Sequence, residues 1–143
     1  MTNKEPSMSK DTKRLGIKLN KDTVIAINEL KEVLYGTPDI PVSESYLIEE
    51  AYKKISPILK KRQLNWDTLN KDGLPNIDSN IYSKTTLLHT TLTLNLETYS
   101  SLLKIQSEMH EATGKRIFFS FVVKLILFAA IHELQGNLET YLR

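Results

Sequence analysis

Two stretches of the sequence carry polar or small residues at every second position, between positions that are mostly leucine or isoleucine. Side chains of a β-strand point alternately to its two faces, so such a stretch would expose its polar set on one face. Hydrogen-bond donors arrayed in this way suit contacts with phosphates and with the edges of nucleic-acid bases. The set comprises Arg14, Gly16 and Lys18 in residues 14–19, and His89, Thr91 and Thr93 in residues 89–94.

Other kinds of chemistry find little support. The chain has no cysteine and only three histidines. Although His110 and His132 are each followed by glutamate, neither completes the H-E-x-x-H zinc pattern. The sequence also contains no phosphate-binding Walker loop, no dinucleotide-binding glycine motif and no nucleophile elbow. We therefore expect no catalytic residue, no metal, no cofactor and no small-molecule substrate.

The composition is that of an ordinary globular protein, with 41% hydrophobic and 25% charged residues and a formal net charge of +2. A charge this close to neutrality neither favours nor excludes a nucleic-acid partner. The absence of cysteine fits a reducing compartment, and the polar N-terminus lacks the apolar core of a secretory signal. The longest apolar run, 117–131, contains Lys124 and is too short to span a bilayer. We expect a cytoplasmic protein without a membrane partner.

Helix signals follow the first stretch directly. Asn20 is a favourable N-cap, Asp22 lies where the helix dipole favours a carboxylate, and Gly36 would end the helix. A second helix is predicted from the cap residue Ser43 onwards. We expect Pro57 to break this helix or to restart it as a short extra helix.

The same signals recur after the second stretch. Asn95 is predicted to cap a helix that ends at Gly114, and a last helix is predicted over 117–134, followed by Gly136. This last helix is apolar on nearly all sides, as helices surrounded by protein are. It would lie at the centre of the helical core or form the interface of a homo-oligomer, and the sequence leaves both alternatives open.

The two sets of signals superpose at a constant offset of 75 residues without a gap. Leu19 and Asn20 fall on Leu94 and Asn95, and the apolar positions of the following helices coincide. An internal duplication of a strand–helix–helix unit is the simplest account. The chain would then comprise a flexible arm (1–12), a first unit (13–59), a linker (60–87), a second unit (88–136) and a tail (137–143). Apolar residues in the linker indicate that parts of it pack onto the units, and these are Trp66, Leu69, Leu74, Ile77, Ile81 and Tyr82.

One such unit is too small to bury its apolar faces, and its strand has two unpaired edges. Two copies solve both problems, because their strands can pair as an antiparallel ribbon over a layer of four helices. We therefore predict a mainly α-helical fold with a short two-stranded antiparallel ribbon. A ribbon of this width fits the major groove of B-DNA, where its outward side chains can reach base edges.

The segments KRLGIKLNKDTV (13–24) and VSESYLIEEA (42–51) resemble the ribbon-helix-helix superfamily of DNA-binding proteins, the CopG, Arc and MetJ group. The second unit resembles this superfamily more loosely, and together the likeness covers 13–59 and 88–136. Two such units in one chain would form a tandem pseudo-dimer, an arrangement similar to that of TraY.

The resemblance implies roles for particular residues. In that superfamily the outward strand residues contact bases, which assigns base contact to the six residues of the alternating set. The first turn of the second helix holds a DNA phosphate, helped by the helix dipole. Three features depart from the pattern, because Gly16 has no side chain to read a base, Glu44 would repel a phosphate, and Phe118 and Phe119 replace small polar residues. The phosphate contacts implied here are Lys13, Ser43, Ser45, Lys115, Arg116 and Ser120.

The expected function is sequence-specific binding of double-stranded DNA, in transcriptional repression or in plasmid copy control, partition or relaxosome assembly. An alternative from another class is a protein-interaction module, such as an antitoxin of the ribbon-helix-helix type. A third alternative is a plain helical bundle in which the duplication is illusory.

Overall fold

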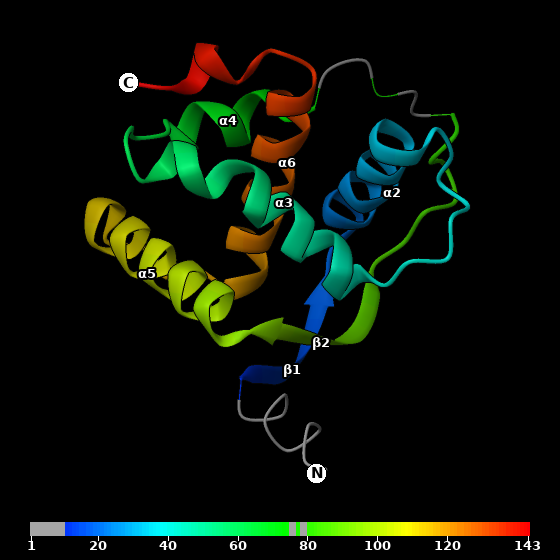
Figure 1. Cartoon of the computed structure of the whole chain (residues 1–143), viewed down its shortest axis with the longest axis horizontal. Coiled ribbons are helices and arrows are strands. Elements are labelled where there is room, and N and C mark those ends of the chain that lie inside the picture. The colour runs from blue at the N-terminus through cyan, green and yellow to red at the C-terminus, as the bar shows by residue number, and fades with distance from the viewer. Residues whose placement is uncertain (1–10, 75–76, 78–79) are drawn as a thin grey trace, which may run out of the picture.

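The computed structural model describes residues 11–74, 77 and 80–143. Within these residues the chain forms a two-stranded antiparallel sheet and five α-helices (Figure 1), so the predicted mainly α-helical fold with a short ribbon is confirmed. In chain order the elements are β1 (Thr12–Leu19), α2 (Lys21–Tyr35), α3 (Glu44–Leu59), α4 (Trp66–Asp72), β2 (Leu88–Asn95), α5 (Leu96–Thr113), α6 (Phe119–Leu134) and the 3-10 helix η1 (Leu138–Tyr141). Residues 1–10 of the predicted arm lie outside the described residues, and Thr12 already belongs to β1.

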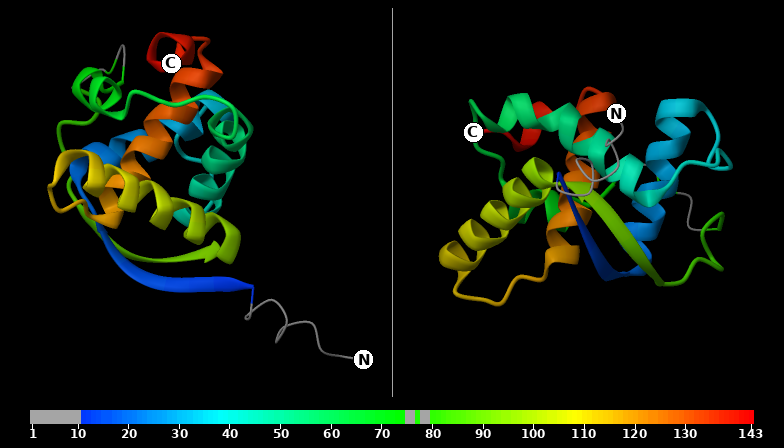
Figure 2. Two further views of the ribbon diagram at one scale, coloured as in Figure 1. Left: turned by 90° about the vertical axis from the view of Figure 1, so that its left-hand side faces the viewer. Right: turned by 60° about the horizontal axis from the view of Figure 1, so that its bottom comes forward.

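The two predicted strand segments pair with each other. β1 and β2 run antiparallel, with Arg14 opposite Thr93 and Leu19 opposite Leu88. The ribbon lies across one end of the molecule, and the helices cover a single face of it (Figure 2). Leu92 and Leu94 are fully buried on that inner face. The prediction that these two stretches form one ladder with a buried apolar face is confirmed.

α2 begins at its predicted cap residue, and α2 and α5 end at their predicted glycines. The side-chain oxygen of Asn20 accepts hydrogen bonds from the backbone N–H and the hydroxyl of Thr23, at 3.0 and 2.8 Å. This cap satisfies an N–H group that the first turn of a helix leaves unpaired. Gly36 ends α2 with a left-handed φ of 82°, and its N–H donates to the Glu32 carbonyl at 2.8 Å. Gly114 ends α5 in the same conformation.

The prediction about the end of the second helix is wrong. α3 continues through Pro57 to Leu59, so the proline neither breaks the helix nor starts another. Because Pro57 lies in the last turn and is exposed, the helix loses little by the missing N–H. α6 runs from Phe119 to Leu134, in agreement with the last helix predicted from about residue 117. Ile117 stays outside the helix, where its carbonyl accepts a hydrogen bond from the Gln106 amide at 2.7 Å.

α6 is the central helix of the core. Ten of its 16 residues are buried, and it contacts α2, α3, α4, α5, η1 and β1. Of the two alternatives for the apolar last helix, the central position in the core is confirmed. The apolar side chains that a homo-oligomer interface through this helix would need are mostly buried within the chain. Even so, no helix in the described part of the protein is long and apolar enough to cross a membrane.

The first part of the linker, residues 60–74, packs with the tail at the end of the molecule opposite the ribbon (Figure 1). The Asn65 N–H donates to the Tyr141 carbonyl at 2.7 Å, and the Tyr141 hydroxyl donates to the Asp72 carboxylate at 2.8 Å. Nearby, the Nε2 atom of the buried His132 lies 2.8 Å from the Gly73 carbonyl oxygen. These contacts join residues on both sides of β2 and α5 in the sequence, so the linker is part of the folded body.

Packing of the linker's apolar residues is confirmed in part. Leu69 and Tyr82 are buried, at 0% and 7% exposure, whereas Ile81 is 71% exposed, so the prediction for Ile81 is wrong. Leu69 belongs to α4, a helix that the polar composition of the linker did not indicate. Trp66 and Leu74 are partly buried against the core.

Candidate nucleic-acid interface

The outward face of the ribbon holds all six residues that were predicted to contact bases. They form three cross-strand pairs, because Arg14 lies opposite Thr93, Gly16 opposite Thr91, and Lys18 opposite His89. Residues directly opposite in an antiparallel ladder share one face, and all six are exposed. The structure therefore brings the predicted set together on the side of the ribbon away from the helices.

This face is basic and carries no carboxylate. Its cations are Arg14 and Lys18, and neither β1 nor β2 contains an acidic residue. The salt bridges among the described residues are Lys53–Glu50 and Arg62–Glu139, and neither involves the ribbon. Cations that no carboxylate neutralises can attract a phosphate backbone and displace its counterions.

Gly16, in the middle of the face, is not required by packing. A Cβ at this position would meet no atom within 4 Å, and its φ lies outside the left-handed region. A glycine inside a strand costs about 0.5–1 kcal/mol relative to alanine, so the stability of the fold does not account for it. Its missing side chain leaves the backbone open to close approach by another molecule.

Two of the predicted phosphate contacts lie at the start of α3, beside β2. The Ser43 hydroxyl oxygen accepts a hydrogen bond from the Tyr46 N–H at 3.1 Å and thereby caps the helix. The Ser45 hydroxyl oxygen accepts one from the Thr93 N–H at 2.9 Å, which ties α3 to the strand. Both oxygens are engaged within the protein, which leaves each O–H hydrogen to donate to a further acceptor.

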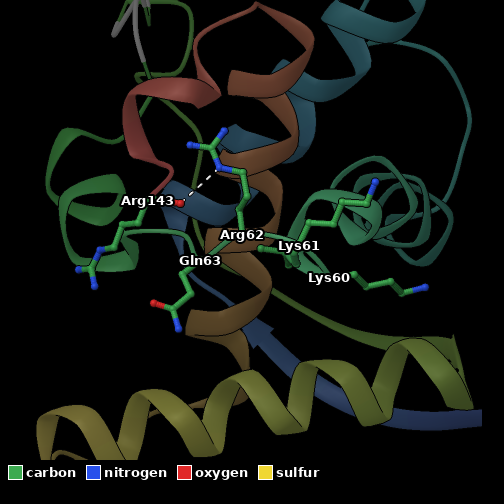
Figure 3. Close-up of a pocket in the computed structure, with 6 residues that line it drawn as sticks. Lys60, Lys61, Arg62, Gln63 and Arg143 are labelled. Atoms are coloured by element: carbon green, nitrogen blue, oxygen red, sulfur yellow. Dashed lines mark hydrogen bonds between the residues drawn. The ribbon is translucent and has the colours of Figure 1, made fainter.

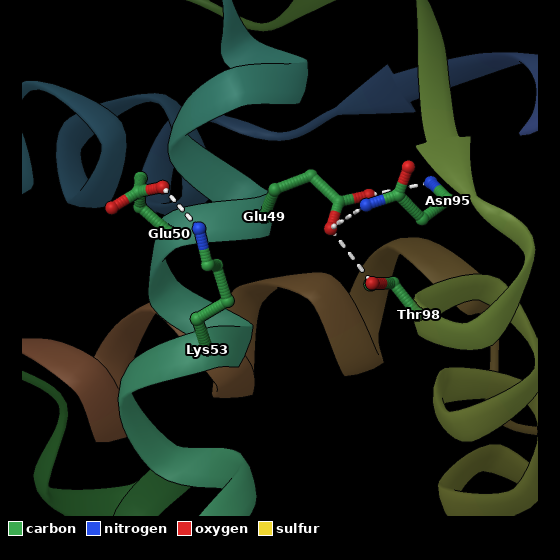
Figure 4. A network of polar contacts seen from close by, with 5 residues as sticks. All are labelled: Glu49, Glu50, Lys53, Asn95 and Thr98. Atoms are coloured by element: carbon green, nitrogen blue, oxygen red, sulfur yellow. Dashed lines mark hydrogen bonds and ion pairs between the residues drawn. The ribbon is translucent and has the colours of Figure 1, made fainter. Parts of the chain in front are cut away.

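Glu49 makes a set of contacts that no sequence pattern signalled (Figure 4). Its carboxylate accepts hydrogen bonds from the Asn95 backbone N–H at 2.6 Å, the Asn95 amide at 3.3 Å and the Thr98 hydroxyl at 2.7 Å. Asn95 occupies the N-cap position of α5, but its side chain donates to Glu49 and makes no cap hydrogen bond, so the predicted cap bond is wrong. The Glu49 carboxylate lies at the start of α5 instead, where the helix dipole favours negative charge.

On α6, Lys124 stands 75 residues after Glu49 and lies in a different environment. Its ammonium is 4.8 Å from the centroid of the Phe121 ring. Burial lowers the pKa of Lys124 below its ordinary value, and attraction to Asp22 in the first turn of α2 partly opposes this shift. The two equivalent positions therefore differ. Lys124 attracts Asp22 at the start of α2, whereas Glu49 accepts hydrogen bonds at the start of α5.

The turn before α6 presents two cations and an aromatic ring. Lys115 and Arg116 are exposed, and the Arg116 guanidinium lies over the Phe118 ring, 4.8 Å from its centroid. Phe118 is 58% exposed. Ser120, another predicted phosphate contact, is half-buried in the first turn of α6.

Aromatic contacts connect the start of α6 to β1. The ring of Phe119 lies 5.5 Å from that of Tyr99 on α5. The ammonium of Lys13 in β1 lies over the same Tyr99 ring, 5.7 Å from its centroid. Lys13 precedes Arg14 in the strand, so the Tyr99 ring connects the first residue of α6 to β1.

A second group of cations lies at the far end of α3 (Figure 3). A shallow pocket of about 410 Å³ is lined there by Leu59, Lys60, Lys61, Arg62, Gln63 and Arg143. Glu139 and the Arg143 carbonyl engage the guanidinium of Arg62 at 2.9 and 3.3 Å. The two lysine side chains point away from Arg143, so the cations do not converge on one point. In the described part of the chain, no group of three or more side chains is placed to hold a metal ion.

No protein-family model, curated protein or solved structure matches this chain. The fold is a mainly helical body with a two-stranded antiparallel ribbon. Its candidate interface is the exposed, basic face of that ribbon together with the starts of α3 and α6.

Proposed function

We propose that this protein binds double-stranded DNA sequence-specifically by inserting its two-stranded ribbon into the major groove. The observation that carries the proposal is the ribbon face itself, with six exposed outward residues, two of them cationic, and no carboxylate. The major groove is wide enough for a two-stranded ribbon and presents a distinct hydrogen-bonding pattern for each base pair. Arg14 and Lys18 would donate to guanine, and Gly16 would let the backbone approach the groove floor.

We further propose that the fold is a tandem ribbon-helix-helix pseudo-dimer. Two features of the helices and of the strand pairing support this proposal. α3 and α6 have the same length of 16 residues and begin 75 residues apart. In the ladder, Gly16 lies opposite Thr91, the residue that the same offset assigns to it. One chain would thus supply both halves of the DNA-binding unit.

The two halves of the ribbon present different side chains, which affects the kind of site that they would read. β1 offers arginine, glycine and lysine, whereas β2 offers histidine and two threonines. A protein with two-fold symmetry reads a palindrome because its half-sites are equivalent. We therefore propose an asymmetric site, read by a cytoplasmic repressor or by an accessory protein in plasmid copy control, partition or relaxosome assembly.

The test is a binding measurement with the full chain. Duplexes are recovered from a random-sequence pool by repeated selection, and the affinity for the consensus is measured by fluorescence anisotropy. We expect Arg14→Ala and Lys18→Ala each to lose about 10–100-fold in affinity, the discrimination of one good base contact. Lys71→Ala, on α4 at the opposite end, is the matched control and should bind like the wild type. Failure to select any consensus, or wild-type affinity in both ribbon variants, would contradict the proposal.

Salt dependence gives a second readout. The logarithm of the binding constant should fall linearly with the logarithm of salt concentration, because phosphate contacts release counterions. Lys115→Gln, which removes one predicted phosphate contact, should reduce the slope by about 0.9. An unchanged slope would remove Lys115 from the interface without affecting the argument for the ribbon.

A further inference from the structure

The two helix–helix connections that flank the ribbon differ in charge. Residues 36–43, between α2 and α3, contain Asp39 and no basic residue, and Glu44 follows them. Residues 114–118, between α5 and α6, contain Lys115 and Arg116 and no acidic residue. A phosphate backbone would be repelled by the first connection and attracted by the second.

Phe118 is the residue in the second connection that folding does not explain. It occupies the N-cap position of α6, where it makes no side-chain cap hydrogen bond, whereas Ser43 caps α3 with its hydroxyl. A helix without a side-chain cap is less stable than one capped by serine, and the Phe118 ring is more than half exposed besides. The residue therefore gives up local stability and buries little apolar surface within the protein.

The Phe118 ring is presented together with a cation. The guanidinium of Arg116 lies over it at 4.8 Å, which holds a planar donor group and an apolar ring in one exposed pair. The next residue, Phe119, is connected through Tyr99 to Lys13 of β1. The pair thus projects from a helix start that is fixed relative to the strand carrying Arg14.

We propose that Arg116 and Phe118 form a clamp on the DNA backbone beside the ribbon, a role that rests on the proposed function. The guanidinium donates to a phosphate oxygen, and the ring packs against the neighbouring deoxyribose. A guanidinium matches the geometry of phosphate oxygens, and a sugar offers the apolar surface that an exposed phenyl ring can cover. Because the first half has Ser43 and Asp39 in its connection, the clamp acts on one side only, and the protected DNA extends further on the α6 side.

The test uses Phe118→Ser, which copies the cap residue of the first half. Its thermal unfolding should match or exceed that of the wild type, since the variant gains a cap and loses only an exposed ring. Its affinity for the selected duplex should fall about tenfold, the effect of burying part of one aromatic ring. Hydroxyl-radical footprinting should show protection of sugars lost on one side of the ribbon site and kept on the other.

Two further variants make the result decisive. Leu103→Ser removes another exposed apolar side chain, on α5, and should bind like the wild type. Arg116→Gln should weaken binding and lower the salt slope by about 0.9. If Phe118→Ser and Arg116→Gln bind like the wild type while Arg14→Ala binds weakly, the clamp is wrong and the ribbon proposal stands. If Arg14→Ala and Lys18→Ala also bind like the wild type, both proposals are wrong.

Discussion

Gly16 lies directly opposite Thr91 at the middle of the β1–β2 ladder, and both residues are exposed. The two are 75 residues apart, the interval that also separates the first residues of α3 and α6. In a ribbon with two-fold symmetry, the residue at the axis pairs with its own copy. The proposed duplication therefore places the pseudo-two-fold axis at this pair, which has one missing side chain and one short polar one.

Replacing Gly16 with threonine separates folding from DNA binding. The Cβ has room, and threonine suits a strand, so stability should stay constant or rise by about 0.5–1 kcal/mol. The added side chain would stand between the backbone and the groove, so affinity for the selected duplex should fall at least about tenfold. Chemical denaturation and anisotropy measure the two effects. Tight binding by the threonine variant would show that the ribbon does not approach DNA closely at its centre.

Glu49 and its neighbour Glu50 form a matched pair for testing the contact between α3 and α5 (Figure 4). Glu49 accepts three hydrogen bonds at the start of α5, whereas Glu50 makes an exposed ion pair with Lys53 at 3.3 Å. Glu49→Gln should cost about 1–2 kcal/mol of unfolding free energy, because hydrogen bonds to a charged acceptor are lost or weakened. Glu50→Gln should cost less than about 0.5 kcal/mol. Equal losses in urea denaturation would refute the structural role of Glu49.

Tyr82 connects the linker to α2 and predicts a dependence on alkaline pH. Its hydroxyl donates to the Glu29 carboxylate, and burial together with this hydrogen bond raises the pKa of Tyr82 well above its ordinary value of 10. The unfolded chain therefore releases this proton near pH 10 while the folded chain retains it. The corresponding stability is fully present below pH 10 and is lost as the pH rises above it, by up to about 1.4 kcal/mol per pH unit.

Tyr82→Phe is the variant that isolates this effect. It should be less stable by about 1 kcal/mol at neutral pH, since one hydrogen bond is missing. Above pH 10 its stability should decline less steeply than that of the wild type, although Tyr35 and Tyr141, whose pKa values are also raised, remain in both proteins. Parallel stability curves for the two proteins between neutral and alkaline pH would contradict the assignment.

The sequence was sufficient where the determining interactions are local. The alternation of residues 14–19 and 89–94, the Asn20 cap and the left-handed Gly36 and Gly114 each act within a few residues, and the structure contains all of them. The strand segments were located correctly and pair antiparallel. The sequence therefore also predicted which side chains lie on the outward face. The six residues predicted to contact bases therefore lie together on one exposed surface.

What the sequence could not supply depends on contacts between distant residues. The Glu49 carboxylate reaches Asn95 across 46 positions, and this contact replaces the expected cap bond. α4 is short and polar on its outer side, and only the packing of Leu69 against the core reveals it. Likewise, the engagement of Ser45 by the Thr93 N–H arises from the placement of α3 beside β2, which no local pattern records.

Amide chemical-shift mapping shows whether the outward face of the ribbon is the surface that enters DNA. The full chain, labelled for proton–nitrogen correlation spectra, is titrated with the duplex recovered by selection. We expect the largest shifts at Arg14, Gly16, Lys18, Thr91 and Thr93, and little change at the pocket residues 60–63 at the opposite end. Shifts concentrated at 60–63, with the ribbon amides unmoved, would contradict the proposal.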